Sequence, residues 1–188
     1  MFIGSHWYKP NGDGAERLLT RIWPLVRARV PGAQLIIAGK SPESIPSYSN
    51  PPAGVEFTGF LPDLDALYAR SRVVVCPITM GGGTRVKLVE AGGYGKPIVS
   101  TRIGAEGLDL EDGVDVLLRD DDRSFADACI RLLSDDTLCA RLGAAARAKA
   151  VAQYDAAKVE RRIANILLST PTQDVATSPA ALSETAAG

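Results

Sequence analysis

The chain has 188 residues and a formal net charge of −1, with basic residues scattered along its length. That length suits one domain of ordinary size, and the even charge gives no sign of a nucleic-acid-binding surface. No apolar run approaches 18 residues and no signal peptide is visible, so we expect a cytoplasmic protein without a transmembrane segment. Three cysteines without a CxxC pair and a single histidine argue against a disulfide framework and against a zinc site.

The expected elements alternate between short apolar strands and helical stretches. Strands are predicted at 1–4, 34–38, 55–57, 73–76, 97–99 and 114–118. Helices are predicted at 13–29, with a kink or split at Pro24, and at 63–71, 84–94, 124–133, 136–152 and 155–169. This alternation predicts an α/β fold with a doubly wound parallel sheet, and the uniformly apolar strands indicate that helices cover both of its faces.

Two loops and a tail complete the expected domain. Residues 5–14, SHWYKPNGDG, are predicted as a polar loop at the edge of the sheet where doubly wound folds bind ligands. His6 in this loop is interpreted as a bystander or, alternatively, as a functional residue. Residues 39–54 are expected to form a flexible excursion or part of the ligand rim. The domain is thus predicted to cover 1–169, and the Ser-, Thr-, Ala- and Pro-rich tail 170–188 is expected to be disordered.

The most informative stretch is 77–101, PITMGGGTRVKLVEAGGYGKPIVST, which reads as strand, glycine turn, helix and strand. Glycines allow close backbone approach and the first helical NH groups lack internal partners, so the turn predicts an anion site, phosphate first of all. Gly83, Lys87 and Glu90 would share one stripe of the helix, and Arg85 adds a cation in its first turn. The alternative is that Lys87 and Glu90 form an ordinary surface pair beside a structural turn.

Several common motifs are absent from the sequence. Gly12 and Gly14 are followed by Arg17 where the dinucleotide fingerprint needs a third glycine. The run GGGTRVK lacks the spacing of a P-loop, and neither GxSxG nor HExxH occurs. These absences weaken the dehydrogenase, NTPase and hydrolase interpretations.

The run GGGTRVKLVE at 81–90, with AGGYGKPIVST after it and GAEGL at 104–108, resembles the donor-binding signature of retaining glycosyltransferases of family 4, often called glycosyl transferases group 1. The resemblance covers about residues 1–165, including FIGS, ARVPGAQLIIAG and VEFTGF. It implies a GT-B fold, in which an N-terminal Rossmann-like domain holds the acceptor and a C-terminal one holds a nucleotide-diphospho-sugar. This chain resembles the C-terminal, donor-binding domain alone, with its C-terminal helices.

The resemblance assigns roles to individual residues. Glu90 matches the glutamate that holds the ribose hydroxyls of the donor, and Gly83 and Thr84 match backbone donors to its diphosphate. The family's first motif glutamate falls at Gly82, so its contact with the transferred sugar is missing or supplied otherwise. Glu106 matches an acidic family position near the donor.

Cations for the leaving diphosphate are the other part of the expected site. The arginine and lysine that the family carries after the first strand are absent in their usual form, because Ser5 stands near the first position and residues 10–11 near the second. Arg85 and Lys87 are therefore the candidates for neutralising the diphosphate, with Lys9 as a helper. The scheme requires no metal and no cofactor, and it assigns no catalytic residue.

The resemblance implies a retaining glycosyltransferase of the hexosyltransferase type, inactive as an isolated domain. Its partners would be the nucleotide-sugar and an N-terminal acceptor domain or separate half-chain. Two alternatives stay open: another GT-B enzyme, such as a nucleotide-sugar 2-epimerase or a phosphorylase, and a non-catalytic or split-half partner domain. The sequence does not define the nucleotide base, the sugar or the acceptor.

Overall fold

The structure, a computed structural model, describes residues 1–154. The helix predicted at 155–169 and the tail predicted at 170–188 lie outside the described residues. The disorder expected for the tail stays a prediction. Within the described part, no helix is both long enough and apolar enough to cross a membrane.

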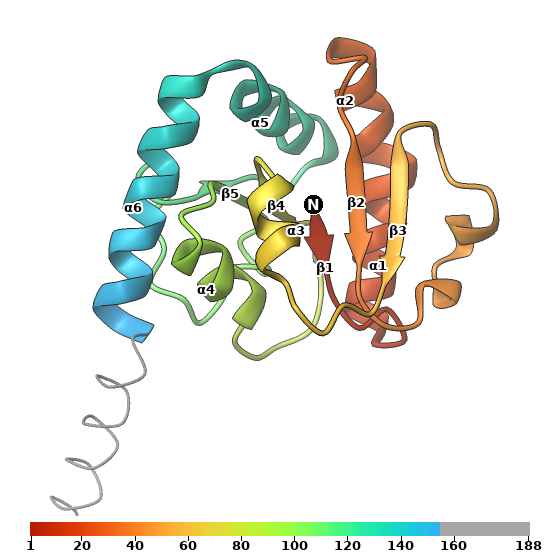
Figure 1. Cartoon of the computed structure of the whole chain (residues 1–188), viewed down its shortest axis with the longest axis horizontal. Helices are drawn as coiled ribbons and strands as arrows, with labels where there is room; N and C mark the ends of the chain where they lie inside the picture. The colour runs from red at the N-terminus through yellow and green to blue at the C-terminus, as the bar shows by residue number, and fades with distance from the viewer. Residues whose placement is uncertain (155–188) are drawn as a thin grey trace, which may run out of the picture. The chain divides into compact units, whose positions relative to one another are not determined.

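Six short parallel strands form the centre of the domain (Figure 1). They are β1 (Phe2–Ile3), β2 (Leu35–Ala38), β3 (Val55–Gly59), β4 (Val74–Cys76), β5 (Ile98–Ser100) and β6 (Leu117–Leu118). They pair as β1-β2-β3 and β4-β5-β6, and β1 meets β4 where the Val75 amide donates to the Met1 carbonyl oxygen at 2.9 Å. The resulting order, 3-2-1-4-5-6, is that of a doubly wound Rossmann-like sheet. The predicted fold class is confirmed.

Helices cover both faces of the strands. They are α1 (Lys9–Arg17), the π-helical turn η1 (Leu18–Ile22), α2 (Trp23–Arg29), α3 (Asp65–Arg70), α4 (Val86–Gly93), α5 (Asp122–Ser134) and α6 (Asp136–Tyr154). Helix α5 packs against α2, while α6 runs alongside α4 (Figure 1). The predicted loop 39–54 contains two 3₁₀ turns, η2 (Pro42–Ser44) and η3 (Pro46–Ser49).

The first helix begins earlier than predicted, at Lys9, so the second half of the expected loop 5–14 is helical. Pro10 stands in the first turn, where its missing NH costs no helical hydrogen bond. Gly12 is buried in this helix. A larger residue would not fit there, because a Cβ would lie 2.8 Å from the His6 carbonyl oxygen. His6 is itself buried, with Nε2 3.1 Å from the Ala38 carbonyl oxygen, and burial lowers its pKa.

The predicted break at Pro24 takes the form of the π-helical turn η1, which ends just before α2. Pro24 then lies in the first turn of α2, a position that tolerates a residue without an NH group. A π turn inserted into an α-helix shifts the hydrogen-bond register by one residue. The chain therefore continues from α1 into α2 without an intervening loop.

The last strand is shorter than the predicted 114–118. Only Leu117–Leu118 pair with β5, and the preceding residues form a turn. Asp115 in that turn is buried and forms an ion pair with Lys149 at 3.1 Å. This ion pair connects the turn to α6. Cys76 and Cys129 are buried, while Cys139 is partly exposed.

Candidate functional site

The candidate site lies where the sheet reverses its strand order. The chain leaves the neighbouring strands β1 and β4 toward opposite edges of the sheet, and open α/β folds bind ligands in the crevice outside the carboxyl ends of such strands. Ser5 follows β1, and the glycine loop, residues 81–83, follows β4. The glycine loop packs against the start of α1, where a Cβ on Gly81 would lie 2.9 Å from Cγ of Pro10.

Helix α4 begins at Val86, with Arg85 as its N-cap, and not at Thr84 as predicted. Gly83 has a φ of +92°, which glycine adopts readily and which is not helical. Gly83 therefore does not share a helical stripe with Lys87 and Glu90, and that prediction is wrong. No side chain caps the first turn of α4, so the positive end of the helix is open toward the glycine loop.

The glycine loop has room for a side chain at one position. Gly82 and Thr84 are both exposed, and a Cβ on Gly82 would meet nothing within 4 Å. The φ of Gly82 lies outside the positive region, unlike those of Gly81 and Gly83. The backbone at position 82 could therefore accommodate a glutamate, although the sequence has glycine there.

Arg85 is buried and holds the glycine loop. Its guanidinium group donates to the carbonyl oxygens of Gly82, at 2.8 Å, and Gly81, at 2.6 Å. Its Nε has no hydrogen-bond partner. In this conformation the guanidinium group of Arg85 stabilises the glycine loop through its carbonyl oxygens. The contact of Arg85 with a diphosphate stays a prediction.

Lys87 is a largely buried cation. Its Nζ donates to Oδ1 of Asn11 at 2.8 Å and lies 4.4 Å from the centre of the Phe2 ring. Among residues 1–154 no carboxylate forms an ion pair with it, so Lys87 and Glu90 are not the surface pair of the alternative interpretation. Burial lowers the pKa of Lys87 to about 8. A cation withdrawn from water without a counter-ion is costly, and a bound anion would offset that cost.

Glu90 lies one turn further along α4. Oη of Tyr68, on α3, donates to Oε2 of Glu90 at 3.3 Å. Tyr68 is fully buried and stacks on Tyr94, with ring centroids 4.1 Å apart and an interplanar angle of 10°. The carboxylate of Glu90 is partly exposed, so it can accept hydrogen bonds from a ligand.

Comparison with protein families identifies the chain. The family model described as glycosyl transferases group 1 matches residues 1–135. The chain belongs to this family. A relative, an uncharacterised 44.6 kDa protein in the cps region of Klebsiella pneumoniae, is 25% identical over 134 residues, which are 67% of this chain and 34% of that protein.

Solved structures share the fold of this group 1 domain. Anabaena HepE, in complex with UDP and glucose, has a TM-score of 0.65 at 21% identity, over 80% of this chain and 45% of HepE. TarM, known from S. aureus, has a TM-score of 0.72 at 18% identity, over 89% of this chain and 34% of TarM. The C-terminal domain of a group 1 protein, LpcC of Francisella tularensis, has a TM-score of 0.60 at 16% identity, over 82% of this chain and 83% of that domain. The predicted GT-B, C-terminal-type domain is confirmed, and this chain spans less than half of HepE and TarM.

Of the remaining predicted residues of the group 1 domain, Ser5 is linked to Lys87 through Asn11, and Lys9 and Glu106 make no hydrogen bond or ion pair with Lys87. Lys9 is exposed, pairs with Asp13 of its own helix at 2.6 Å, and lines a cleft of about 810 Å³ between α1, the 3₁₀ turns after β2 and the loops after β4 and β6. That cleft includes no residue from 81–90. The main-chain oxygen of Ser5 accepts a hydrogen bond from Nδ2 of Asn11 at 3.1 Å. Glu106 is exposed in the turns between β5 and β6.

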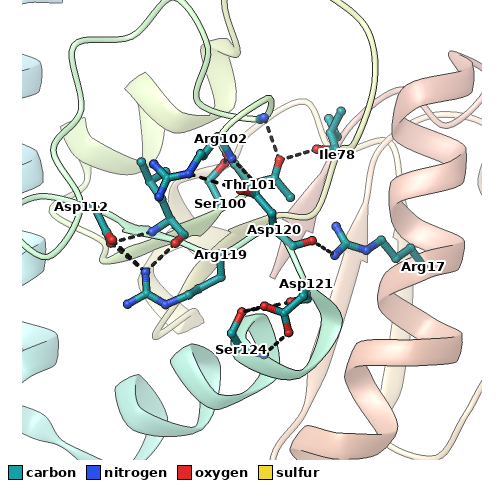
Figure 2. Close-up of polar contacts among 12 residues, drawn as sticks. Arg17, Ile78, Ser100, Thr101, Arg102, Asp112, Arg119, Asp120, Asp121 and Ser124 are labelled. Atoms are coloured by element: carbon teal, nitrogen blue, oxygen red, sulfur yellow. Dashed lines mark hydrogen bonds and ion pairs between the residues drawn. The ribbon is translucent and has the colours of Figure 1, made fainter.

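The loops at the carboxyl edge of the group 1 domain are tied together by polar contacts (Figure 2). Thr101, after β5, donates to the carbonyl oxygen of Ile78, after β4. The main-chain amide of Arg102 donates to the carboxylate of Asp120, after β6, at 2.8 Å. From α1, Arg17 donates to the Asp120 carbonyl oxygen at 2.6 Å. These bonds fix the loops after three successive strands relative to α1.

Sequence reasoning missed two residues of the site, Asn11 and Tyr68. Asn11 stands near the position where the family carries a lysine, and no local pattern marks it as the hydrogen-bond partner of Lys87. Tyr68 lies on the helix predicted at 63–71, but no local pattern indicates its contact with Glu90. A buried tyrosine needs a partner for its hydroxyl, and this rule is the signal that could have directed attention to Glu90.

Proposed function

We propose that this domain binds a nucleotide-diphospho-sugar in the crevice between the loops after β1 and β4. The observation that carries the proposal is the partly buried ammonium of Lys87, which has no carboxylate partner among residues 1–154 and lies beside the uncapped start of α4. A diphosphate in the crevice would supply the missing counter-charge. The UDP bound in the HepE structure, which shares this fold, supports the same ligand class.

Each end of the donor has a proposed partner. The diphosphate is placed against the backbone of Gly83 and Thr84, where the exposed loop leaves space for a ligand. Lys87 neutralises part of the charge of the diphosphate. Arg85 adds a second positive charge next to the carbonyl oxygens of Gly81 and Gly82. The ribose hydroxyls donate to the carboxylate of Glu90, one turn along α4 from Lys87.

The proposed reaction is transfer of the glycosyl group with retention of configuration. The bond from the anomeric carbon to the diphosphate oxygen breaks, a bond to an acceptor hydroxyl oxygen forms, the proton of that hydroxyl passes to the diphosphate, and a nucleoside diphosphate leaves. Fixed cations and helix NH groups stabilise the developing charge on that leaving group, so no metal is needed. The acceptor is held by an N-terminal domain or half-chain, and the isolated domain is inactive in transfer. We place the reaction in the cytoplasm.

Isothermal titration of the 188-residue chain with UDP-, GDP-, ADP- and dTDP-sugars tests the proposal. One of the four is expected to bind, and Lys87→Met is expected to weaken that binding by about tenfold or more because it removes the charge and keeps the length of the side chain. Circular dichroism checks that the variant is folded. Absence of binding to all four donors at millimolar concentration would refute the proposal.

A further inference from the structure

Tyr68 lies under the proposed ribose end of the site. Among the described residues, Tyr68 has one of the largest fully buried side chains. Tyr68 is on α3, and Glu90 is on α4. Its hydroxyl reaches Oε2 of Glu90 at 3.3 Å. On its outer side the ring stacks against Tyr94, whose own hydroxyl donates to Asp65 and makes no contact with Glu90.

This contact constrains a flexible carboxylate. A glutamate side chain has three rotatable bonds, and ordering it on binding costs free energy that a preorganised site avoids. The hydroxyl of Tyr68 occupies one carboxylate oxygen, Oε2, and no hydrogen bond to Oε1 is found in residues 1–154. The free oxygen is the one available to a vicinal diol.

The protonation of the pair supports the same arrangement. Burial, and then the negative charge of Glu90, raise the pKa of Tyr68 well above its usual value. The phenol therefore stays a hydrogen-bond donor throughout the physiological pH range. Since a buried tyrosine hydroxyl requires a partner, Glu90 is held as its acceptor in the unliganded protein as well.

We infer that Tyr68 is a positioning residue of the donor site, which holds the carboxylate of Glu90 so that its free oxygen faces the 2′- and 3′-hydroxyls of the ribose. This assignment rests on the proposed function, because it needs a nucleotide at Glu90. Tyr68 does not touch the ligand. It determines how strongly the domain distinguishes a ribose diol from a sugar that lacks it.

The experiment combines a change in the protein with a change in the ligand. Tyr68→Phe removes one hydroxyl and keeps the stacked ring, and Tyr94→Phe is the matched control in the same stack. Each full-length variant is titrated with UDP, with 2′,3′-dideoxy-UDP and with inorganic pyrophosphate. The wild type is expected to prefer UDP over the dideoxy compound, and Tyr68→Phe to lose about tenfold in affinity for UDP, the effect of a hydrogen bond to a charged group.

The other titrations separate positioning from a general structural effect. Tyr68→Phe is expected to keep its affinity for dideoxy-UDP and pyrophosphate, and Tyr94→Phe to bind all three ligands as the wild type does. Unchanged UDP affinity in Tyr68→Phe, or an equal loss for all three ligands, would overturn the assignment of Tyr68 and leave the proposed function standing. A wild type that binds neither pyrophosphate nor any of the four nucleotide-sugars would overturn both.

Discussion

The ammonium of Lys87 donates to the side-chain oxygen of Asn11 at 2.8 Å, and so joins α4 to α1 across the reversal of the sheet. The nitrogen of the same amide donates to the carbonyl oxygen of Ser5 at 3.1 Å. Gly4 makes room for this arrangement, because a Cβ there would lie 2.8 Å from Cγ of Asn11. One neutral side chain thus fixes the cation of the site without neutralising it.

The neutrality of Asn11 leads to the first prediction. Asn11→Ala removes the acceptor that fixes Lys87 and is expected to weaken UDP binding severalfold. Asn11→Asp keeps the shape but supplies a carboxylate that pairs with Lys87, so a diphosphate would then compete with an internal anion. We expect Asn11→Asp to bind UDP more weakly than Asn11→Ala, by titration calorimetry at low salt. Tighter binding by Asn11→Asp would contradict the role given to the unpaired charge.

The second prediction concerns pH. With its pKa lowered to about 8 by burial, Lys87 is protonated at neutral pH and loses its proton as the pH rises past that value. UDP affinity is expected to be constant between roughly pH 6.5 and 7.5 and to fall between roughly pH 8 and 9.5. Lys87→Met is expected to bind weakly and to show no such fall. A wild-type profile that is flat up to pH 9.5 would exclude Lys87 as the ligand cation.

The same shift affects stability, with the opposite dependence on pH. The folded-state pKa of Lys87 lies below its ordinary value of 10.5, so between about pH 8 and 10.5 the unfolded chain binds more protons than the folded one. The contribution of Lys87 to the free energy of unfolding therefore rises with pH across that window. At pH 7, Lys87→Met is expected to raise the melting temperature, as followed by circular dichroism, because it removes a partly buried charge that has no carboxylate partner among residues 1–154.

Much of the fold could be predicted from the sequence, because strands buried on both faces appear as apolar runs. Residues 34–38 and 73–76 fall within one residue of β2 and β4. Helix starts were predicted less well. Glycines at 12 and 14 favoured a loop, but close packing against His6 and Ile78 requires small residues there, and local propensity does not report such packing.

The site could be predicted only in part, for a related reason. Lys87 and Glu90 were found because their helical spacing and the resemblance both concern neighbours in sequence. Their hydrogen-bond partners are distant, since Asn11 is 76 residues from Lys87 and Tyr68 is 22 residues from Glu90. These contacts are created by the order of the strands, which brings α1 and α3 to α4, and no local pattern contains that information.

The third prediction tests the network of Figure 2 at Arg17. This nearly buried guanidinium donates to the carboxylate of Asp122 at 2.6 Å and to the carbonyl oxygens of Pro77 and Asp120. Arg17→Ala is expected to lower the free energy of unfolding by about 2–4 kcal/mol, because it removes the nearest cation from the partly buried Asp122 and the donor from two loop carbonyl oxygens. Urea unfolding measures the loss.

Arg21→Ala is the control for this prediction. Arg21 is 4.0 Å from the same Asp122 carboxylate, but its side chain is 71% exposed. Exposed ion pairs contribute little, so a change within about 0.5 kcal/mol is expected. Similar losses in the two variants would mean that charge near Asp122, and not the bonds of Arg17 to the loops after β4 and β6, determines stability.

The last prediction concerns how α4 is held, through two adjacent glycines. A Cβ on Gly92 would lie 2.9 Å from the carbonyl oxygen of Ala146 in α6, whereas a Cβ on Gly93 would meet nothing within 4 Å. Gly92→Ala is expected to lower the free energy of unfolding by about 1–3 kcal/mol, because α6 must move away. Gly93→Ala is expected to leave it unchanged or to raise it by up to about 1 kcal/mol, since alanine favours the helix.

Opposite signs at two neighbouring positions would separate the packing of α4 on α6 from the helix propensity of α4 itself. Urea unfolding of both variants gives the signs, and UDP titration shows whether the packing extends its effect to the site. Because Lys87 and Glu90 are on α4, a displaced α4 in Gly92→Ala should weaken UDP binding, while Gly93→Ala should bind as the wild type does. If Gly92→Ala were destabilised and yet bound UDP normally, α6 would support the fold of α4 without setting the position of its ligand-binding residues.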